Sequence, residues 1–347
     1  MSNFKIKYLK YKSKYLQLKN QFGGEGLIKH ALCTATLAGH SDHVYSVAFH
    51  PTEPFLATGS GDETAKLWRF SPDGSTATCV ATLAGHSWNV LSVAFHPMAP
   101  FLATGSSDDT AKLWLLSSDN LSATCVATLT GHSYGVYSVA FHPTAPLLAT
   151  GSDDKTAKLW RFSYDGSTAT CVATLTGHIG GVMSVAFHPT APLLGTGSLD
   201  NFAKLWHFSP DGSTATCVAT LVGHSGCVTS VAFHPTAHLL ATGSIDNTAK
   251  LWSFSPDGST ATCVATLAGH SDRVYSVAFH PTEPLLVTGS DDNTVKLWSF
   301  SPDGSTAICV ATLVGHSDNV NSVVFCPMTP LLATGSSDKT AKLWSLK

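Results

Sequence analysis

Short runs of alternating apolar and polar residues recur along this chain, and turn-forming residues separate them. In one representative stretch they read ATCVATL, VLSVAF, PFLATGS and AKLWL, at residues 77–83, 90–95, 100–106 and 111–115. Each run has the length of a β-strand and is rich in β-branched, aliphatic or aromatic residues. The segment that connects one unit to the next, SPDGS at residues 71–75, has Pro-Asp-Gly turn chemistry. The pattern predicts four short antiparallel strands per unit.

The same unit recurs seven times with a period of 46 residues. A Gly-His dipeptide opens each copy, and a Trp follows 28 residues after each His. The seven dipeptides begin at Gly39, Gly85, Gly131, Gly177, Gly223, Gly269 and Gly315. A unit of this size cannot bury its apolar face alone, so successive copies must pack on one another. The repeat therefore predicts a single domain at residues 30–347, although the length alone would allow two.

The pattern GH–SVAFHP–LLATGS–D–KLW resembles the WD40 repeat, whose signature has GH near the start and Trp-Asp at the end. The resemblance covers residues 31–347. It implies an all-β fold, a seven-bladed β-propeller with four antiparallel strands per blade. The Asp after Trp is absent from every copy, and its place is taken by Arg69, Leu115, Arg161, His207, Ser253, Ser299 and Ser345.

The two ends of the repeat region predict how the ring closes. A lone first strand at residues 31–37 precedes the first complete copy, and the chain stops just after Trp344, one strand short of a seventh unit. We expect residues 31–37 to complete the last blade. This arrangement hides two sheet edges that would otherwise invite aggregation.

Charge is unevenly distributed. Residues 1–29 hold seven Lys and one Glu, whereas residues 30–347 carry a net charge of −9. The repeat region therefore lacks the basic surface that nucleic-acid phosphates require. No apolar run is long enough to span a membrane, and the N-terminus has no secretory signal.

Seven of the nine Cys share the 46-residue period, namely Cys33, Cys79, Cys125, Cys171, Cys217, Cys263 and Cys309. Equivalent positions in successive blades lie too far apart for disulfide geometry. No CxxC pair suggests zinc. We expect one small buried thiol per repeat, in a reducing compartment.

Each copy also holds a His, a Thr, an Asp and a Trp at constant offsets. These are His40, Thr58, Asp62 and Trp68 in the first copy, and His132, Thr150, Asp154 and Trp160 in the third. Hydroxyl, imidazole and carboxylate are the parts of a hydrolase triad, but seven equal active sites in one ring are improbable. The WD40 resemblance implies instead a relay of hydrogen bonds that lets a blade bury polar groups. We expect no catalysis, no cofactor and no metal.

A second periodic series precedes proline, and consists of His50, His96, His142, His188, His234 and His280, with Cys326 in the seventh copy. A metal site needs its ligands close together, and a 46-residue period does not provide ligand spacing within one site. We interpret these residues as turn residues at the start of the connection between the first two strands of each unit.

The near-identical copies differ mainly after Gly-His, before the Ser of the second run, and around the turn Asp. By the WD40 resemblance, these places lie on the face that usually binds partners, where loops stand on a rigid scaffold. We expect a protein or peptide to bind there through Tyr45, Trp88, Leu91, Tyr134, Tyr137, Ile179, Met183, Leu199, Ile245, Arg273 and Tyr275. The alternative is drift after duplication, with these side chains tucked between blades. A single Arg disfavours phosphopeptide binding.

Residues 1–29 stand outside the repeat. Their aromatic and aliphatic residues follow helical spacing among lysines, which predicts a basic amphipathic helix that ends at Gly23-Gly24. A short self-associating coiled coil, a surface-binding helix and a frayed tail all remain open. The string KYLKYKSKYLQLKNQFGG is similar to leaders on proteins of giant DNA viruses of amoebae. That similarity implies a viral protein in the host cytoplasm or the virion.

Together these patterns favour a non-enzymatic, monomeric, cytoplasmic scaffold for protein–protein interaction. Two other functions stay open, namely a structural or virion-packaged component and a propeller that binds a small ligand or glycan.

Overall fold

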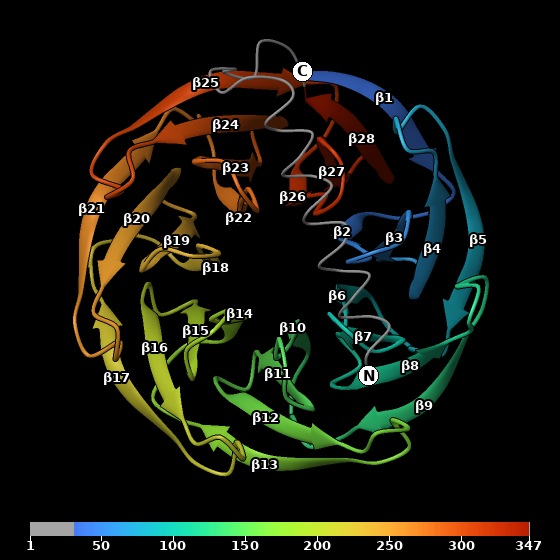
Figure 1. Ribbon diagram of the computed structural model, residues 1–347, viewed down its shortest axis with the longest axis horizontal. Coiled ribbons are helices and arrows are strands. Elements are labelled where there is room, and N and C mark those ends of the chain that lie inside the picture. Colours follow the sequence, from blue (N-terminus) through green and yellow to red (C-terminus); the bar gives the residue numbers. More distant parts are fainter. Residues whose placement is uncertain (1–30, 347) are drawn as a thin grey trace.

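The computed structural model describes residues 31–346, and the predicted leader at residues 1–29 lies outside the described residues. Seven four-stranded antiparallel sheets stand in a ring around a common axis (Figure 1). We letter the strands of each blade a to d, from the axis outwards. The predicted seven-bladed all-β propeller is confirmed. Among the described residues, no helix has the length and apolar character needed to cross a membrane.

The blades follow the chain order, and their strand bounds repeat closely. Blade 1 contains β2 (Val44–Phe49), β3 (Phe55–Ser60), β4 (Thr64–Phe70) and β5 (Ala77–Ala84); blade 2 contains β6 (Val90–Phe95), β7 (Phe101–Ser106), β8 (Ala111–Leu116) and β9 (Ala123–Leu129); blade 3 contains β10 (Val136–Phe141), β11 (Leu147–Ser152), β12 (Ala157–Phe162) and β13 (Ala169–Leu175). Blade 4 contains β14 (Val182–Phe187), β15 (Leu193–Ser198), β16 (Ala203–Phe208) and β17 (Ala215–Leu221); blade 5 contains β18 (Val228–Phe233), β19 (Leu239–Ser244), β20 (Thr248–Phe254) and β21 (Ala261–Ala268). Blade 6 contains β22 (Val274–Phe279), β23 (Leu285–Ser290), β24 (Thr294–Phe300) and β25 (Ala307–Val314); blade 7 contains β26 (Val320–Phe325), β27 (Leu331–Ser336), β28 (Thr340–Leu346) and β1 (Ala31–Ala38).

The hydrophobic core lies between blades. Strand b is buried on both faces in every blade, because each sheet is covered by a neighbour on either side. Gly59 in β3 shows how closely the sheets approach, since a Cβ there would lie 2.9 Å from Cγ1 of Val90 and 3.1 Å from Cγ1 of Val93 in the next blade. Side chains larger than glycine would push the two sheets apart, so this position sets the spacing between blades.

The ring closes through the first strand, as the sequence predicted. Strand β1 pairs antiparallel with β28, from Ala31 opposite Leu346 to Ala38 opposite Thr340. Hydrogen bonds also run around the inner strands, where Ser46 Oγ accepts from Val93 N at 3.1 Å in the next blade. The same bond joins blade 7 to blade 1, from Val47 N to Ser322 Oγ at 3.1 Å. The closing junction is therefore built like the other six.

The prediction of one buried thiol per repeat was wrong. Six of the seven periodic thiols, in strand d of blades 1 to 6, are exposed, and Cys33 is half-buried. The cause is a bulge in strand d: the pairing passes from Leu67 opposite Ala81 to Trp68 opposite Cys79, which leaves Val80 as an extra residue. The bulge breaks the alternation of faces, so the Cys turns outwards. All nine thiols are free.

Candidate functional site

The four residues of the relay meet at one end of each blade. In blade 1, His40 Nδ1 lies 2.8 Å from Asp62 Oδ2, and His40 Nε2 lies 2.7 Å from Thr58 Oγ1. Trp68 Nε1 donates to the same Thr58 oxygen at 2.9 Å. Asp62 also accepts hydrogen bonds from the backbone N of Ser41 and from Thr64. Thr58 is fully buried and Trp68 nearly so.

Donor chemistry fixes the direction of the relay. The Trp68 indole can only donate, so Thr58 accepts from it and sends its own proton to His40 Nε2. The histidine is then neutral, with its proton on Nδ1 facing Asp62. Burial lowers the pKa of His40 and outweighs the neighbouring Asp62, which acts in the opposite direction. Burial alone would raise the pKa of Asp62, but hydrogen bonds led by Thr64 and His40 lower it. The pair is therefore a neutral imidazole beside a carboxylate.

All seven blades contain this relay with nearly the same geometry. The His–Asp and His–Thr distances are 2.7–2.8 Å and each Trp–Thr distance is 2.9 Å, including His132, Thr150, Asp154 and Trp160 of blade 3. A hydrolase nucleophile must touch its substrate, but the seven Thr side chains are 0% exposed. The geometry therefore suits a structural role.

Replacing Asp154 with Ala is expected to lower the free energy of unfolding by about 1–3 kcal/mol, because His132 Nδ1 and the donors of Thr156 lose their acceptor. The measurement is urea unfolding of Asp154→Ala. Asp153→Ala is the matched control, since Asp153 makes none of the relay's hydrogen bonds and is expected to cost little. Equal losses for both variants would show that the relay aspartate is not what holds this turn.

The His-Pro residues close the connection between strands a and b. His50 Nδ1 accepts from the backbone N of Thr52 at 3.2 Å and of Glu53 at 3.1 Å. Its ring also packs edge-on against Phe95 of the next blade, with centroids 5.0 Å apart. Burial lowers the pKa of His50 to about 4. These residues are placed at turns, where the sequence predicted them. Within residues 31–346, no group of three or more His, Cys, Asp or Glu is placed to hold a metal.

The variable positions gather on one face, which we call the mouth face: the d–a loops and b–c turns of all blades. In blade 1 the backbone N of Gly61, in the b–c turn, donates to His43 O in the d–a loop at 2.9 Å. The same bond recurs in each blade, as in Ile245 N to Cys227 O at 3.1 Å. The loops that differ most between copies are thus held on a hydrogen-bonded frame.

The structure divides the predicted binding residues into two groups. Trp88, Tyr134 and Ile179 project from the d–a loops of blades 2, 3 and 4 and are 63%, 61% and 78% exposed. Leu199 and Arg273 are exposed as well. The others are half-buried, namely Tyr45, Leu91, Tyr137, Met183, Ile245 and Tyr275.

The half-buried group, apart from Ile245 in a b–c turn, occupies a position whose side chain reaches the seam between blades in two other copies. Most of its members occupy the second position of strand a, and the equivalent Thr229 donates to Val274 O of the next blade at 2.6 Å. Asn321 likewise donates to Val44 O at 3.0 Å across the closing junction. The alternative of side chains tucked between blades therefore fits the half-buried residues of strand a, whereas Trp88, Tyr134 and Ile179 project from the d–a loops into solvent.

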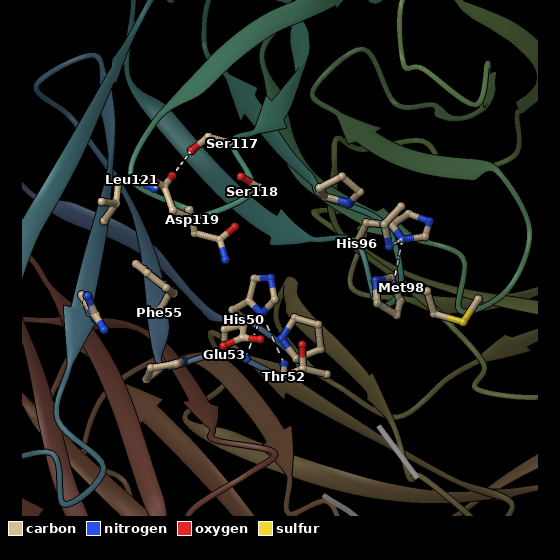
Figure 2. Close-up of a pocket in the computed structure, with 17 residues that line it drawn as sticks. His50, Thr52, Glu53, Phe55, His96, Met98, Ser117, Ser118, Asp119 and Leu121 are labelled. Atoms are coloured by element: carbon tan, nitrogen blue, oxygen red, sulfur yellow. Dashed lines mark hydrogen bonds between the residues drawn. The ribbon is translucent and has the colours of Figure 1, made fainter. Parts of the chain in front are cut away.

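The opposite face carries a cavity that sequence analysis missed. It encloses about 400 Å³ between blades 1 and 2. Figure 2 shows the turn with Ser117 and Asp119 on one side and His50, Glu53 and Phe55 on the other. Arg69 also lines it. The lining thus includes one guanidinium and two carboxylates, of which Asp119 already accepts hydrogen bonds from Ser117 and from Leu121 N.

The c–d turn beside this cavity differs from the other c–d turns in sequence. Elsewhere this turn contains a glycine with positive φ that packs on the preceding blade; at Gly166 a Cβ would lie 2.5 Å from Phe101 Cε1. In blade 2 the sequence is SSDNLS, and Asn120, with φ 56°, takes the place of that glycine. Asn120 and Phe55 of blade 1 both line the cavity. The absence of the turn glycine from this copy is the sequence feature that could have pointed to this turn.

Comparison with known families agrees with this geometry. The family described as "WD domain, G-beta repeat" matches residues 31–69, 77–114, 123–161, 169–207, 215–253, 261–299 and 307–345. These segments cover most of the chain. The protein belongs to the WD40-repeat family.

Individual relatives match only one repeat of this WD40 protein. WD repeat-containing protein 37 of Xenopus tropicalis is 47% identical over 38 residues, and that of Homo sapiens is 46% identical over 39 residues. Each match covers 11% of this chain and 8% of the relative. The match thus spans less than a tenth of the curated relatives, and it compares one blade rather than whole proteins.

Proposed function

We propose that this WD40 propeller is a non-enzymatic scaffold that binds a protein or peptide on its mouth face. One observation carries the proposal. Trp88, Tyr134 and Ile179 are large apolar side chains that are exposed to solvent on three neighbouring blades. The loops that carry them are hydrogen-bonded to the b–c turns. Apolar exposure of this kind does not help folding, whereas aromatic residues on a rigid frame are the usual anchors of an interface.

Two alternatives make different predictions. A virion-packaged component would be found in purified particles and would have no soluble partner. A small-ligand or glycan binder would bind its ligand without any protein. The leader at residues 1–29 supports the viral alternative only by resemblance, and we propose the host cytoplasm or the virion as the location on that basis.

Changing Tyr134 and Ile179 together to Ala is expected to weaken binding of a captured protein partner about tenfold or more, because truncated anchors typically cost above about 1 kcal/mol each. Binding is measured by titration of purified partner, with melting curves to check the fold. Tyr164→Ala is the matched control, since Tyr164 is 85% exposed on a c–d turn of the opposite face. If Tyr164→Ala lowers the affinity and the change of Tyr134 and Ile179 does not, the partner binds the opposite face and the assignment of the mouth face is wrong.

A further inference from the structure

The mouth face is chemically uneven around the ring. Blades 2 to 4 carry the exposed Trp88, Tyr134, Ile179 and Leu199. Elsewhere on this face the large exposed apolar residues are single valines beside a Gly-His dipeptide, namely Val222 before blade 5 and Val314 at the end of β25. A partner that covers this face therefore meets an apolar half on one side of the axis.

The other side of the face is acidic. Asp272 and Asp318, in the d–a loops of blades 6 and 7, are both exposed and both lie near Asp291 in the b–c turn of blade 6. Oδ1 of Asp291 is buried and has no hydrogen-bond partner among the described residues. Burial, with Asp272 next in effect, raises the pKa of Asp291 to about 6. Three carboxylates are thus crowded together, and one of them has an unused acceptor.

The acidic half is not neutralised from within. Arg273 is the cation of this group, and its guanidinium also bonds to Tyr275. Outside the relay, the loops and turns of the whole face carry seven acidic residues, Asp42, Glu63, Asp109, Asp153, Asp272, Asp291 and Asp318, against three basic ones, Lys155, Arg273 and Lys339. A lysine of strand c acts on each relay histidine, as Lys66 does on His40, so the relay region holds seven lysines as well as seven aspartates and leaves the balance of charge unchanged. A net negative potential remains at the mouth.

We propose that the mouth face binds a basic segment that also carries an aromatic or aliphatic anchor. The anchor packs on Trp88, Tyr134 and Ile179, and Lys or Arg side chains cross the axis to Asp272, Asp291 and Asp318. This inference rests on the proposed function and specifies the partner's chemistry. Anionic partners, including nucleic acids, phosphopeptides and anionic membranes, are disfavoured by the same charges.

The test uses two synthetic amphipathic peptides of equal length that share Leu and Trp anchors. One has Lys at every polar position and the other has Glu. Each labelled peptide is titrated with the full chain, and binding is followed by fluorescence anisotropy. We expect the Lys peptide to bind about tenfold more tightly than the Glu peptide, and its affinity to fall as salt is raised.

Variants separate the two halves. The double variant Asp272→Asn with Asp318→Asn is expected to lower the affinity for the Lys peptide roughly three- to tenfold, because exposed ion pairs contribute little each. Its affinity for the Glu peptide is expected not to fall. Trp88→Ala with Ile179→Ala is expected to weaken binding of the Lys peptide about tenfold or more. The controls on the opposite face are Tyr164→Ala and the pair Asp73→Asn with Asp165→Asn. They remove an aromatic ring and two carboxylates, and we expect them to leave the affinity for either peptide unchanged.

Three outcomes overturn the inference: no binding of the Lys peptide, equal binding of both peptides, or equal effects of the mouth-face and opposite-face charge variants. If both peptides bind equally and both depend on Trp88 and Ile179, the proposed docking face stands and only its basic preference fails. If binding depends on Tyr164 and ignores Trp88, the proposed function fails as well.

Discussion

A chain that lacks residues 31–38 is expected to yield no soluble monomer. Without β1, the whole edge of β28 from Thr340 to Leu346 loses its partner strand. Leu37, buried at 2% exposure in the core between blades 7 and 1, is lost with it. Loss of one such leucine typically costs about 2–5 kcal/mol, and an unpaired edge templates aggregation. Size-exclusion chromatography and thermal melting measure the result.

A chain that begins at Gly26 is the control for this deletion. It keeps β1 and removes most of the leader, so we expect the melting temperature of the full chain. Leu37→Ala is a milder variant that keeps the strand pairing and is expected to lower stability without aggregation. A monomeric, normally melting chain without residues 31–38 would contradict the closure described here.

Acidification from neutral pH to about 4 is expected to unfold the protein. Burial lowers the pKa of all seven relay histidines, and it lowers the pKa of His50 and of His96 to about 4. The histidines of the unfolded chain therefore bind protons near the ordinary pKa of 6.5. The buried histidines of the folded chain stay neutral until the pH is lower. The contribution of these histidines to stability is complete above pH 6.5 and is lost as the pH falls through their pKa values in the folded chain.

The expected loss is large. A pKa unit corresponds to about 1.4 kcal/mol, so His50 and His96 alone contribute about 3 kcal/mol each, against a total stability of roughly 5–15 kcal/mol. Protonation of His50 Nδ1 also breaks its bonds from Thr52 N and Glu53 N. The relay aspartates act in the same direction at lower pH, because their pKa values are also lowered.

The chain supplies its own control for the acid effect. Cys326 stands at the His position of blade 7, where its sulfur accepts hydrogen bonds from the backbone of Met328 and of Thr329. The variants His50→Cys and His96→Cys remove two titrating rings and keep an atom that can bond to the turn. Chemical denaturation at several pH values should show a flatter decline for the double variant. His207→Gln removes an exposed ring and serves as the control; an equal flattening there would refute the buried histidines as the cause.

Most of the fold follows from period and composition. The β-branched and aromatic residues at 90–95 predicted β6 with its observed bounds, Val90–Phe95, and the lone first strand predicted the pairing of β1 with β28. These features repeat seven times, so a local ambiguity in one copy is settled by the others. The relay was predictable from two grounds together: its sevenfold occurrence argues against an active site, and the WD40 resemblance implies a hydrogen-bond network in each blade.

Features that depend on the details of strand pairing or on the distance between neighbouring blades were not predictable from the sequence. The outward turn of Cys79 results from a bulge that no residue pattern marks. The crowding of Asp291 with Asp318 joins two different blades, and the half-buried state of Tyr137 depends on how closely blades pack. Sequence divergence located the mouth face but did not separate its exposed anchors, such as Ile179, from residues at the seams.

Hydrogen–deuterium exchange of the full chain, alone and saturated with a purified partner, shows which face of the propeller the partner covers. We expect slowed exchange in the loops at residues 85–89, 131–135 and 177–181, and unchanged exchange in the opposite turns at residues 71–75 and 163–167. Protection of the opposite turns, with the loops around Trp88, Tyr134 and Ile179 unaffected, would contradict this expectation.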